Sequence, residues 1–151
     1  MAGITQAICT SFKQELLTAT HNFTNTTGDV FKIALFRAAA SIVGTYGAAT
    51  TNYSNMTGNS DEATGSGYTA GGNSLTNVTP TSSGTTAFTD FADTTWAGAT
   101  ITASGALIYN SSASDKSVAV LNFGGDKTST SGDFTIIFPT ADASNAIIRI
   151  A

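Results

Sequence analysis

The chain has 151 residues, of which 91 are Ala, Gly, Ser, Thr or Asn, and 6 Lys and Arg stand against 10 Asp and Glu, giving a net charge of −4. A hydrophobic content of 41%, including nine Phe, is too high for a disordered chain and predicts one domain with a packed core. Six scattered cations cannot form a phosphate-binding patch, so nucleic acid is not an expected partner, and one Cys cannot make an internal disulfide.

Neither a membrane span nor an export signal is expected. The longest apolar runs fall far short of the roughly 18 residues that a spanning helix needs. The first twenty residues have no basic start and no continuous apolar segment, so they do not resemble a secretory signal.

Residues 4–19 predict an amphipathic helix. Ile4, Ile8, Phe12 and Leu16 recur every four residues and would share one face. Two interpretations stay open: this face packs on the core of its own domain, or it docks on a neighbouring subunit. We divide the chain into a helix with its connection over 1–28 and a β-domain over 29–151.

The first strand is expected over 29–37, where Phe31, Ile33 and Leu35 alternate with Lys32 and Ala34. A long loop over about 38–72 follows, and its part from 52 to 72 holds five Gly and few large apolar side chains. We expect this part to be a surface excursion that adds little to the core.

Three tyrosines in or near this loop are candidate contact residues for a saccharide or a protein: Tyr46, Tyr53 and Tyr68. The alternative is that they only hold the loop in place.

Short strands separated by turn-forming residues are expected in the C-terminal half. The ranges are 74–79, 86–91, 95–103, 105–110, 117–123, 133–138 and 146–150. No ten-residue helix lies between them, so the pattern favours antiparallel pairing in a single β-sandwich or barrel-like domain, mainly β with one N-terminal helix.

Groups for catalysis are few. His21 is the only histidine and follows the predicted helix, and no nucleophile elbow or phosphate-binding loop occurs. We therefore expect no enzyme and assign no catalytic, cofactor-binding or metal residue. Two pairs of loop carboxylates are minor candidates for a site: Asp90 with Asp93, and Asp126 with Asp133. Such a pair could bind Ca²⁺ or flank a glycosidic bond of a sugar.

Several short blocks carry a resemblance to a known class of protein. FKIAL, SGYTAGG, LTNVTPT, TWAGATITASGALIYN and KSVAVLNFGGDKTSTSGDFTI occur in this order over residues 29–150. Together they resemble small virion structural proteins of tailed bacteriophages, whereas residues 38–62 match no such block. The resemblance implies a virion protein that is made in the host cytoplasm and released by lysis.

The resemblance leads to two main hypotheses. In the first, the chain is a decoration or cement protein that binds the major capsid protein of the assembled head and stabilises it, as a homo-oligomer such as a trimer. In the second, it is a tail, neck or baseplate component or a host-glycan-binding domain. A small hydrolase acting on host polysaccharide is a third, weaker alternative.

Overall fold

The computed structural model describes residues 2–151. Strands hold 47% of the chain and helices 13%, which confirms the expected mainly β domain. In chain order, with η marking a 3-10 helix, the elements are β1 (Gly3–Ile4), β2 (Ala7–Ile8), α1 (Thr10–Leu17), β3 (Phe31–Phe36), η1 (Ala39–Ser41), β4 (Thr45–Tyr46), α2 (Ser54–Gly58), β5 (Asn73–Ser74), β6 (Asn77–Ser83), β7 (Thr86–Phe91), β8 (Thr94–Asn110), η2 (Ser111–Ala113), β9 (Lys116–Ile136) and β10 (Ile148–Ile150).

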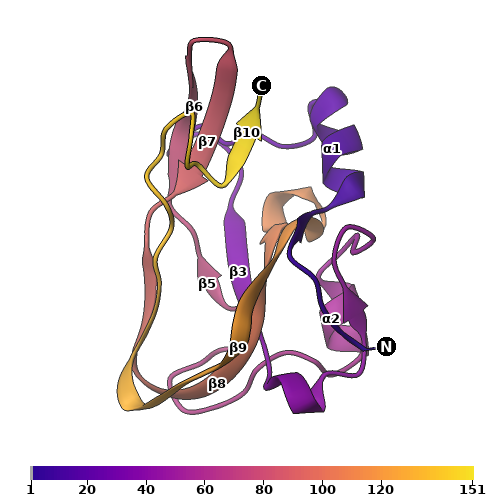
Figure 1. The fold of residues 1–151 in the computed structure, drawn as a ribbon, viewed down its shortest axis with the longest axis vertical. Helices are drawn as coiled ribbons and strands as arrows, with labels where there is room; N and C mark the ends of the chain where they lie inside the picture. Colours follow the sequence, from indigo (N-terminus) through magenta and orange to yellow (C-terminus); the bar gives the residue numbers. More distant parts are fainter. Residues whose placement is uncertain (1) are drawn as a thin grey trace.

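Two antiparallel sheets and one short parallel pair make up the domain (Figure 1). The large sheet has the order β2-β9-β8-β3-β5, the small sheet has the order β10-β7-β6, and β1 pairs in parallel with β4. Phe31 of β3 and Phe91 of β7 meet with their ring centroids 5.6 Å apart. Both sheets therefore contribute to one core.

The centre of the fold is the long hairpin of β8 and β9, paired from Thr94 opposite Ile136 to Asn110 opposite Lys116. Shifts of register interrupt the pairing, and Gly98 on β8 and Ser131 on β9 have positive φ angles of 59° and 49°. Such bulges bend a hairpin without ending it. Figure 1 shows the hairpin curling at its lower end.

The bend corrects the strand boundaries expected from the sequence. Ranges 95–103 and 105–110 form one strand, and so do 117–123 and 133–138, because each bulge leaves the pairing on both sides of it intact. The bend also returns the far end of β9 to its beginning, so that the rings of Phe123 and Phe134 lie 6.4 Å apart.

The predicted helix over 4–19 is wrong for its first part. Only Thr10–Leu17 is helical, whereas Ala7 and Ile8 form β2 and pair with β9 at Val120 and Ala119. The outer edge of β9 supplies backbone partners to this segment, and such tertiary pairing overrides a local helical periodicity.

The expectation that residues 52–72 add little to the core is also wrong. Met56 is fully buried and Ala63 is 2% exposed, both within the main core cluster. The segment runs along β3, where the Ala63 amide donates to the Leu35 carbonyl at 2.8 Å and the Arg37 amide donates to the Asp61 carbonyl at 3.0 Å. A few apolar side chains and these backbone bonds are enough to hold a Gly-rich segment in place.

Candidate functional site

Each of the four candidate carboxylates accepts hydrogen bonds from backbone amides. Among residues 2–151 no group of three His, Cys, Asp or Glu side chains is placed to hold a metal ion. The bonds run to Asp90 from the amides of Phe91 (2.8 Å) and Ile147 (3.1 Å), to Asp93 from Phe138 (2.8 Å), to Asp126 from Ala39 (2.7 Å) and to Asp133 from Gly98 (3.0 Å).

Asp90 is the most buried of these carboxylates, at 1% exposure. Burial raises the pKa of Asp90, the two amide bonds oppose that rise, and the charge of Asp93 adds to it. Through Ile147 this carboxylate ties the C-terminal segment to β7. Asp90 therefore holds two segments of the domain together. A raised pKa is also typical of a general acid.

Tyr46 is not an exposed contact residue. It is 1% exposed, its ring lies 4.4 Å from that of Phe36, and its hydroxyl donates to Asp61 Oδ2 at 2.7 Å. Burial and the bond to Asp61 raise the pKa of Tyr46 to about 12.

Asp61 is fully buried and is the centre of a dense polar cluster. Besides Tyr46 it accepts from the amides of Val43 and Gly44, and Arg37 donates to it through Nε at 3.1 Å and Nη2 at 2.8 Å. Burial alone would raise the pKa of Asp61, but these hydrogen bonds outweigh it and hold the pKa below its usual value. No periodic pattern in the sequence marks Asp61 for this role.

Tyr53 and Tyr68 converge on Glu62 and are half-buried. Their hydroxyls donate to the two Glu62 oxygens at 2.6 and 2.8 Å, and the Gly71 amide donates to Glu62 Oε1 at 2.6 Å. Burial, with the nearby Glu62 carboxylate, raises the pKa of both phenols. These contacts match the alternative in which the tyrosines hold the loop in place.

The four residues of the expected helical face lie on different elements. Phe12 on α1 is 1% exposed in the core, and Leu16 is partly buried against it. Ile4 on β1 and Ile8 on β2 are partly buried against the same core. The structure thus places all four on their own domain, and a role for them in docking a neighbouring subunit stays a prediction.

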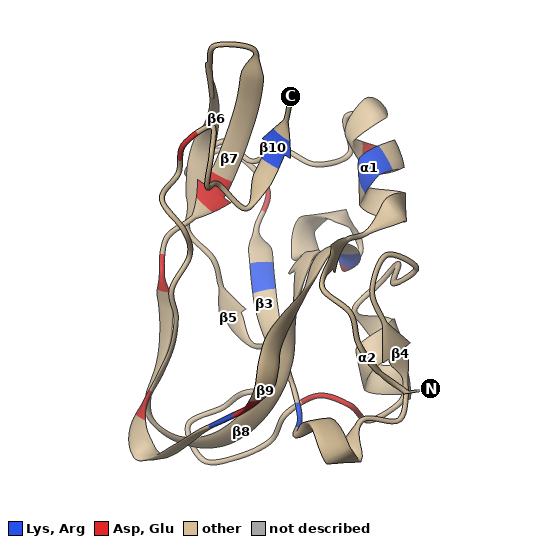
Figure 2. Ribbon diagram, viewed as in Figure 1, with Lys and Arg blue, Asp and Glu red and all other residues tan. Residues whose placement is uncertain are grey.

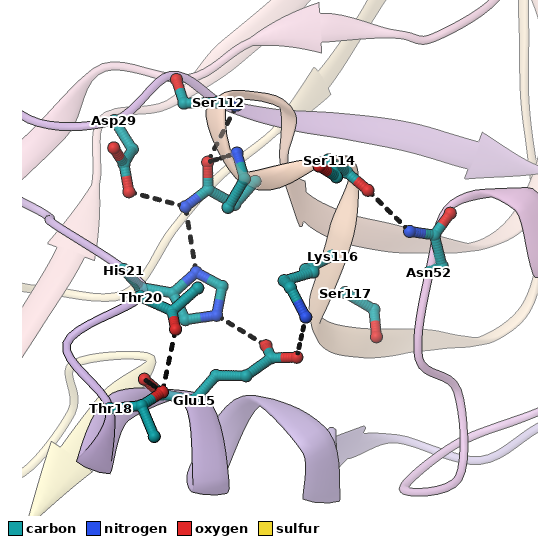
Figure 3. A network of polar contacts seen from close by, with 12 residues as sticks. Glu15, Thr18, Thr20, His21, Asp29, Asn52, Ser112, Ser114, Lys116 and Ser117 are labelled. Atoms are coloured by element: carbon teal, nitrogen blue, oxygen red, sulfur yellow. Dashed lines mark hydrogen bonds and ion pairs between the residues drawn. The ribbon is translucent and has the colours of Figure 1, made fainter.

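A buried polar network joins α1 to the hairpin turn (Figure 3). His21 Nε2 lies 2.8 Å from Glu15, which also accepts from Lys116 at 2.8 Å, and His21 Nδ1 lies 2.9 Å from the Asn110 amide nitrogen. That nitrogen also donates to Asp29 at 2.7 Å, while Asn110 Oδ1 accepts from the Ser112 and Ala113 amides.

The network fixes the roles of its members. Because the Asn110 amide is oriented by Asp29 and by two backbone donors, it can only donate to His21 Nδ1, so the imidazole carries its proton on Nε2 and donates to Glu15. The side chain of His21 is fully buried. Through Glu15, the arrangement docks α1 on the hairpin at Lys116.

An open groove of about 770 Å³ lies between the two arms of the bent β9 and the C-terminal segment. It falls within the volume range of ligand sites in proteins. Sequence reasoning missed it because its walls come from distant residues, although the run FTIIFP places apolar side chains on both faces of a strand. The apolar lining consists of Leu121, Phe123, Phe134, Ile136, Ile137, Phe138, Pro139, Ala146 and Ile147.

Charged side chains are thinly distributed over the fold. Figure 2 shows the Lys and Arg residues spread over the fold. Lys127 on β9 and Arg149 on β10 both line the groove. No helix in the described part of the chain combines the length and the apolar character needed to cross a membrane.

Comparisons of the chain with protein-family models, with curated proteins and with solved structures yield no match.

Proposed function

We propose that this chain is a structural protein of a tailed-bacteriophage particle, and specifically a decoration protein that binds the major capsid protein on the assembled head. In this role it acts as a homo-oligomer and stabilises the shell by binding the assembled lattice more tightly than free subunits.

The observation that carries the proposal is the position of the resembling blocks. The two longest blocks, TWAGATITASGALIYN and KSVAVLNFGGDKTSTSGDFTI, coincide with β8 and β9, the hairpin that forms the centre of the domain. The resembling blocks thus form the scaffold of the whole domain, and the resemblance is not limited to one peripheral loop.

The chemistry of the domain supports a structural role. Its buried carboxylates accept backbone or tyrosine hydrogen bonds, as at Asp61 and Asp90, and His21 is enclosed in a docking network. The tyrosines that were candidate glycan contacts are engaged within the domain, since Tyr46 is 1% exposed and Tyr53 and Tyr68 donate to Glu62.

The proposal is tested by adding the purified protein to assembled heads that lack it and to unassembled capsid subunits. Saturable binding to assembled heads in hundreds of copies, with increased resistance of the heads to heating, is the expected result. Binding confined to a few dozen copies at the tail would favour a tail component. No binding to any part of the particle would overturn the proposal.

A further inference from the structure

Both sheets end in a strand whose outer edge is open, and the two open edges face each other. β10 is the last strand of the small sheet, and β2 is the last strand of the large sheet. β2 pairs with β9 only at Ala119 and Val120. Among the described residues, no strand pairs with the outer edge of β10 or with that side of β9 beyond Val120.

Two adjacent hollows occupy the space between these edges. The 770 Å³ groove is lined by Leu121 and Phe123 of β9 and, across from them, by Arg149 of β10. A second hollow of about 380 Å³ is lined by Ile8 of β2 together with Arg149. The two hollows share Ile147 and Arg149 in their linings, and we call them together the seam between β10 and the β2–β9 edge.

The backbone of the seam is only partly engaged, although the Asn122 side chain donates to the Ile4 carbonyl at 2.7 Å. The Asn122 amide has only the side chain of exposed Gln6 as an acceptor, at a long 3.4 Å. Such a weak bond to a surface side chain is displaced at little cost. Half-buried Leu121, Phe123 and Ile147 offer apolar surface beside it.

We propose that the seam accepts one extended strand of another polypeptide, which pairs with the outer edge of β10 and places alternate apolar side chains on Leu121, Phe123 and Ile147. An extended strand is the occupant that fits this edge, because its backbone donors and acceptors repeat at the same spacing as those of β10. The inference holds whether or not the chain belongs to a phage head.

The charges of the seam specify the occupant further. Lys127 and Arg149 line it, and Lys127 forms no ion pair within the described residues. The single carboxylate of the lining, Asp133, already accepts the Gly98 amide. A strand with an acidic residue at one end therefore fits better than one with a basic end.

A second copy of this chain is a poorer occupant. Its edge strand β6 has the sequence NVTPTSS, with one large apolar residue, Val78, and a proline that interrupts a row of backbone donors. Its edge strand β10 would bring the Arg149 of one copy against the Arg149 and Lys127 of the other, and β2 and β5 have only two residues each. The partner strand is therefore assigned to a different protein.

The test tethers the strand Glu-Thr-Val-Thr-Val-Thr-Val behind Ala151 through a flexible Gly/Ser linker of about ten residues, which gives an effective concentration in the millimolar range. Its control replaces the central Val of the added strand with Pro. The body of the protein is the same in both, so folding is common to them. Amide hydrogen exchange is measured at Asn122, whose N–H faces outward from β9, and along β10 at Ile148, Arg149 and Ile150.

We expect exchange at these amides to slow about tenfold or more with the Glu-led strand, less with a Lys-led version, and not at all with the Pro version. No protection by the Glu-led strand, or equal protection by the Pro version, would overturn the proposal. Protection that grows with the concentration of the untethered protein would overturn it in favour of self-association.

Discussion

The two edges of the large sheet differ in how fully other segments of the chain cover them. Along β3 the edge is sealed by residues 61–75, through backbone bonds at Leu35, Arg37 and Phe31 and through the Tyr68 hydroxyl, which accepts the Leu35 amide at 3.0 Å. Along β9 the edge is covered by two residues of β2 and is then left beside a groove.

The difference shows where this protein uses its few charged groups. Asp61 and Glu62, two of its ten acidic residues, both serve the sealed edge and bind three tyrosines there. The open edge is instead protected from uncontrolled pairing by a bulge at Gly124 and Gly125 and by the charge of Lys127. We expect changes at the sealed edge to alter stability and changes at the open edge to alter binding.

Asp61→Ala is expected to have the largest effect. It leaves the Val43 and Gly44 amides and the Tyr46 hydroxyl without their acceptor in a buried site, at a cost of about 3–5 kcal/mol in the free energy of unfolding. Urea unfolding measures the loss. The control Asp93→Ala removes one bond to Phe138 at an exposed carboxylate and should cost only about 1 kcal/mol. Equal losses of unfolding free energy in the two variants would show that the sealed edge contributes no more to stability than an exposed carboxylate does.

Acid should weaken the sealed edge through the same carboxylate. Because the pKa of Asp61 is lower in the folded protein than in the unfolded chain, its contribution is complete above the unfolded pKa of about 3.9 and is lost as the pH falls through the folded pKa. Asp90 has a raised pKa and the opposite sign, so protonating it first adds stability. We expect Asp61→Asn, and not Asp90→Asn, to flatten the fall in stability below about pH 4. A series of urea titrations between neutral and acid pH measures this slope.

Gly72→Ala should rank next. Gly72 directly precedes β5 and packs against β3, with a φ of +69°, and an added Cβ would meet the Ile33 carbonyl oxygen at 1.8 Å. Gly124 is the matched control, because its φ is +72° and its added Cβ would meet nothing within 4 Å. We expect about 1–2 kcal/mol of destabilisation for Gly124→Ala from the backbone alone and about 2 kcal/mol more for Gly72→Ala. Thermal unfolding of both variants measures the difference. Similar destabilisation in the two would mean that the backbone around Gly72 moves away from β3 at little cost.

The sequence predicted the main features of the sealed edge in part. The alternation of Phe31, Ile33 and Leu35 was sufficient to predict β3, because a strand in a buried sheet has a strong pattern. The segment that covers it was predicted as a surface loop, since its anchors are single polar residues. A buried Asp61 has the same appearance in a sequence as an exposed one, and only its five donors distinguish it.

The open edge was not predictable by the same means. Ala7 and Ile8 fit a helical period as well as a strand, and their strand state depends on β9 more than 100 residues further along the chain. The groove depends on the bend in the β8–β9 hairpin, which follows from bulges at Gly98 and Ser131. Bulges arise from pairing between strands, so neither residue alone indicates them.

Glu62→Gln should have a smaller effect than the changes above. The amide keeps one acceptor oxygen, so one of the bonds from Tyr53, Tyr68 and the Gly71 amide is lost or reversed, at a cost of about 1–2 kcal/mol. Urea unfolding measures it, with Thr69→Ala, an exposed position in the same segment, as the control that should stay within about 0.5 kcal/mol. A neutral Glu62→Gln would mean that the tyrosines hold the segment by packing alone.

Ile137→Ser is expected to change stability least, and it examines the open edge directly. Ile137 is 77% exposed on the rim of the groove, so its replacement should alter the free energy of unfolding by no more than about 0.5 kcal/mol. Its neighbour Ile136 is partly buried against the core, and Ile136→Ser should cost about 2 kcal/mol or more. In the strand-tethered protein the two variants should have the opposite order of effect on hydrogen exchange in the seam. Ile137→Ser should weaken the protection of the seam amides although it leaves the fold intact. A stability loss at Ile137 equal to that at Ile136 would show that this rim belongs to the core, and the contrast between a sealed and an open edge would then fail.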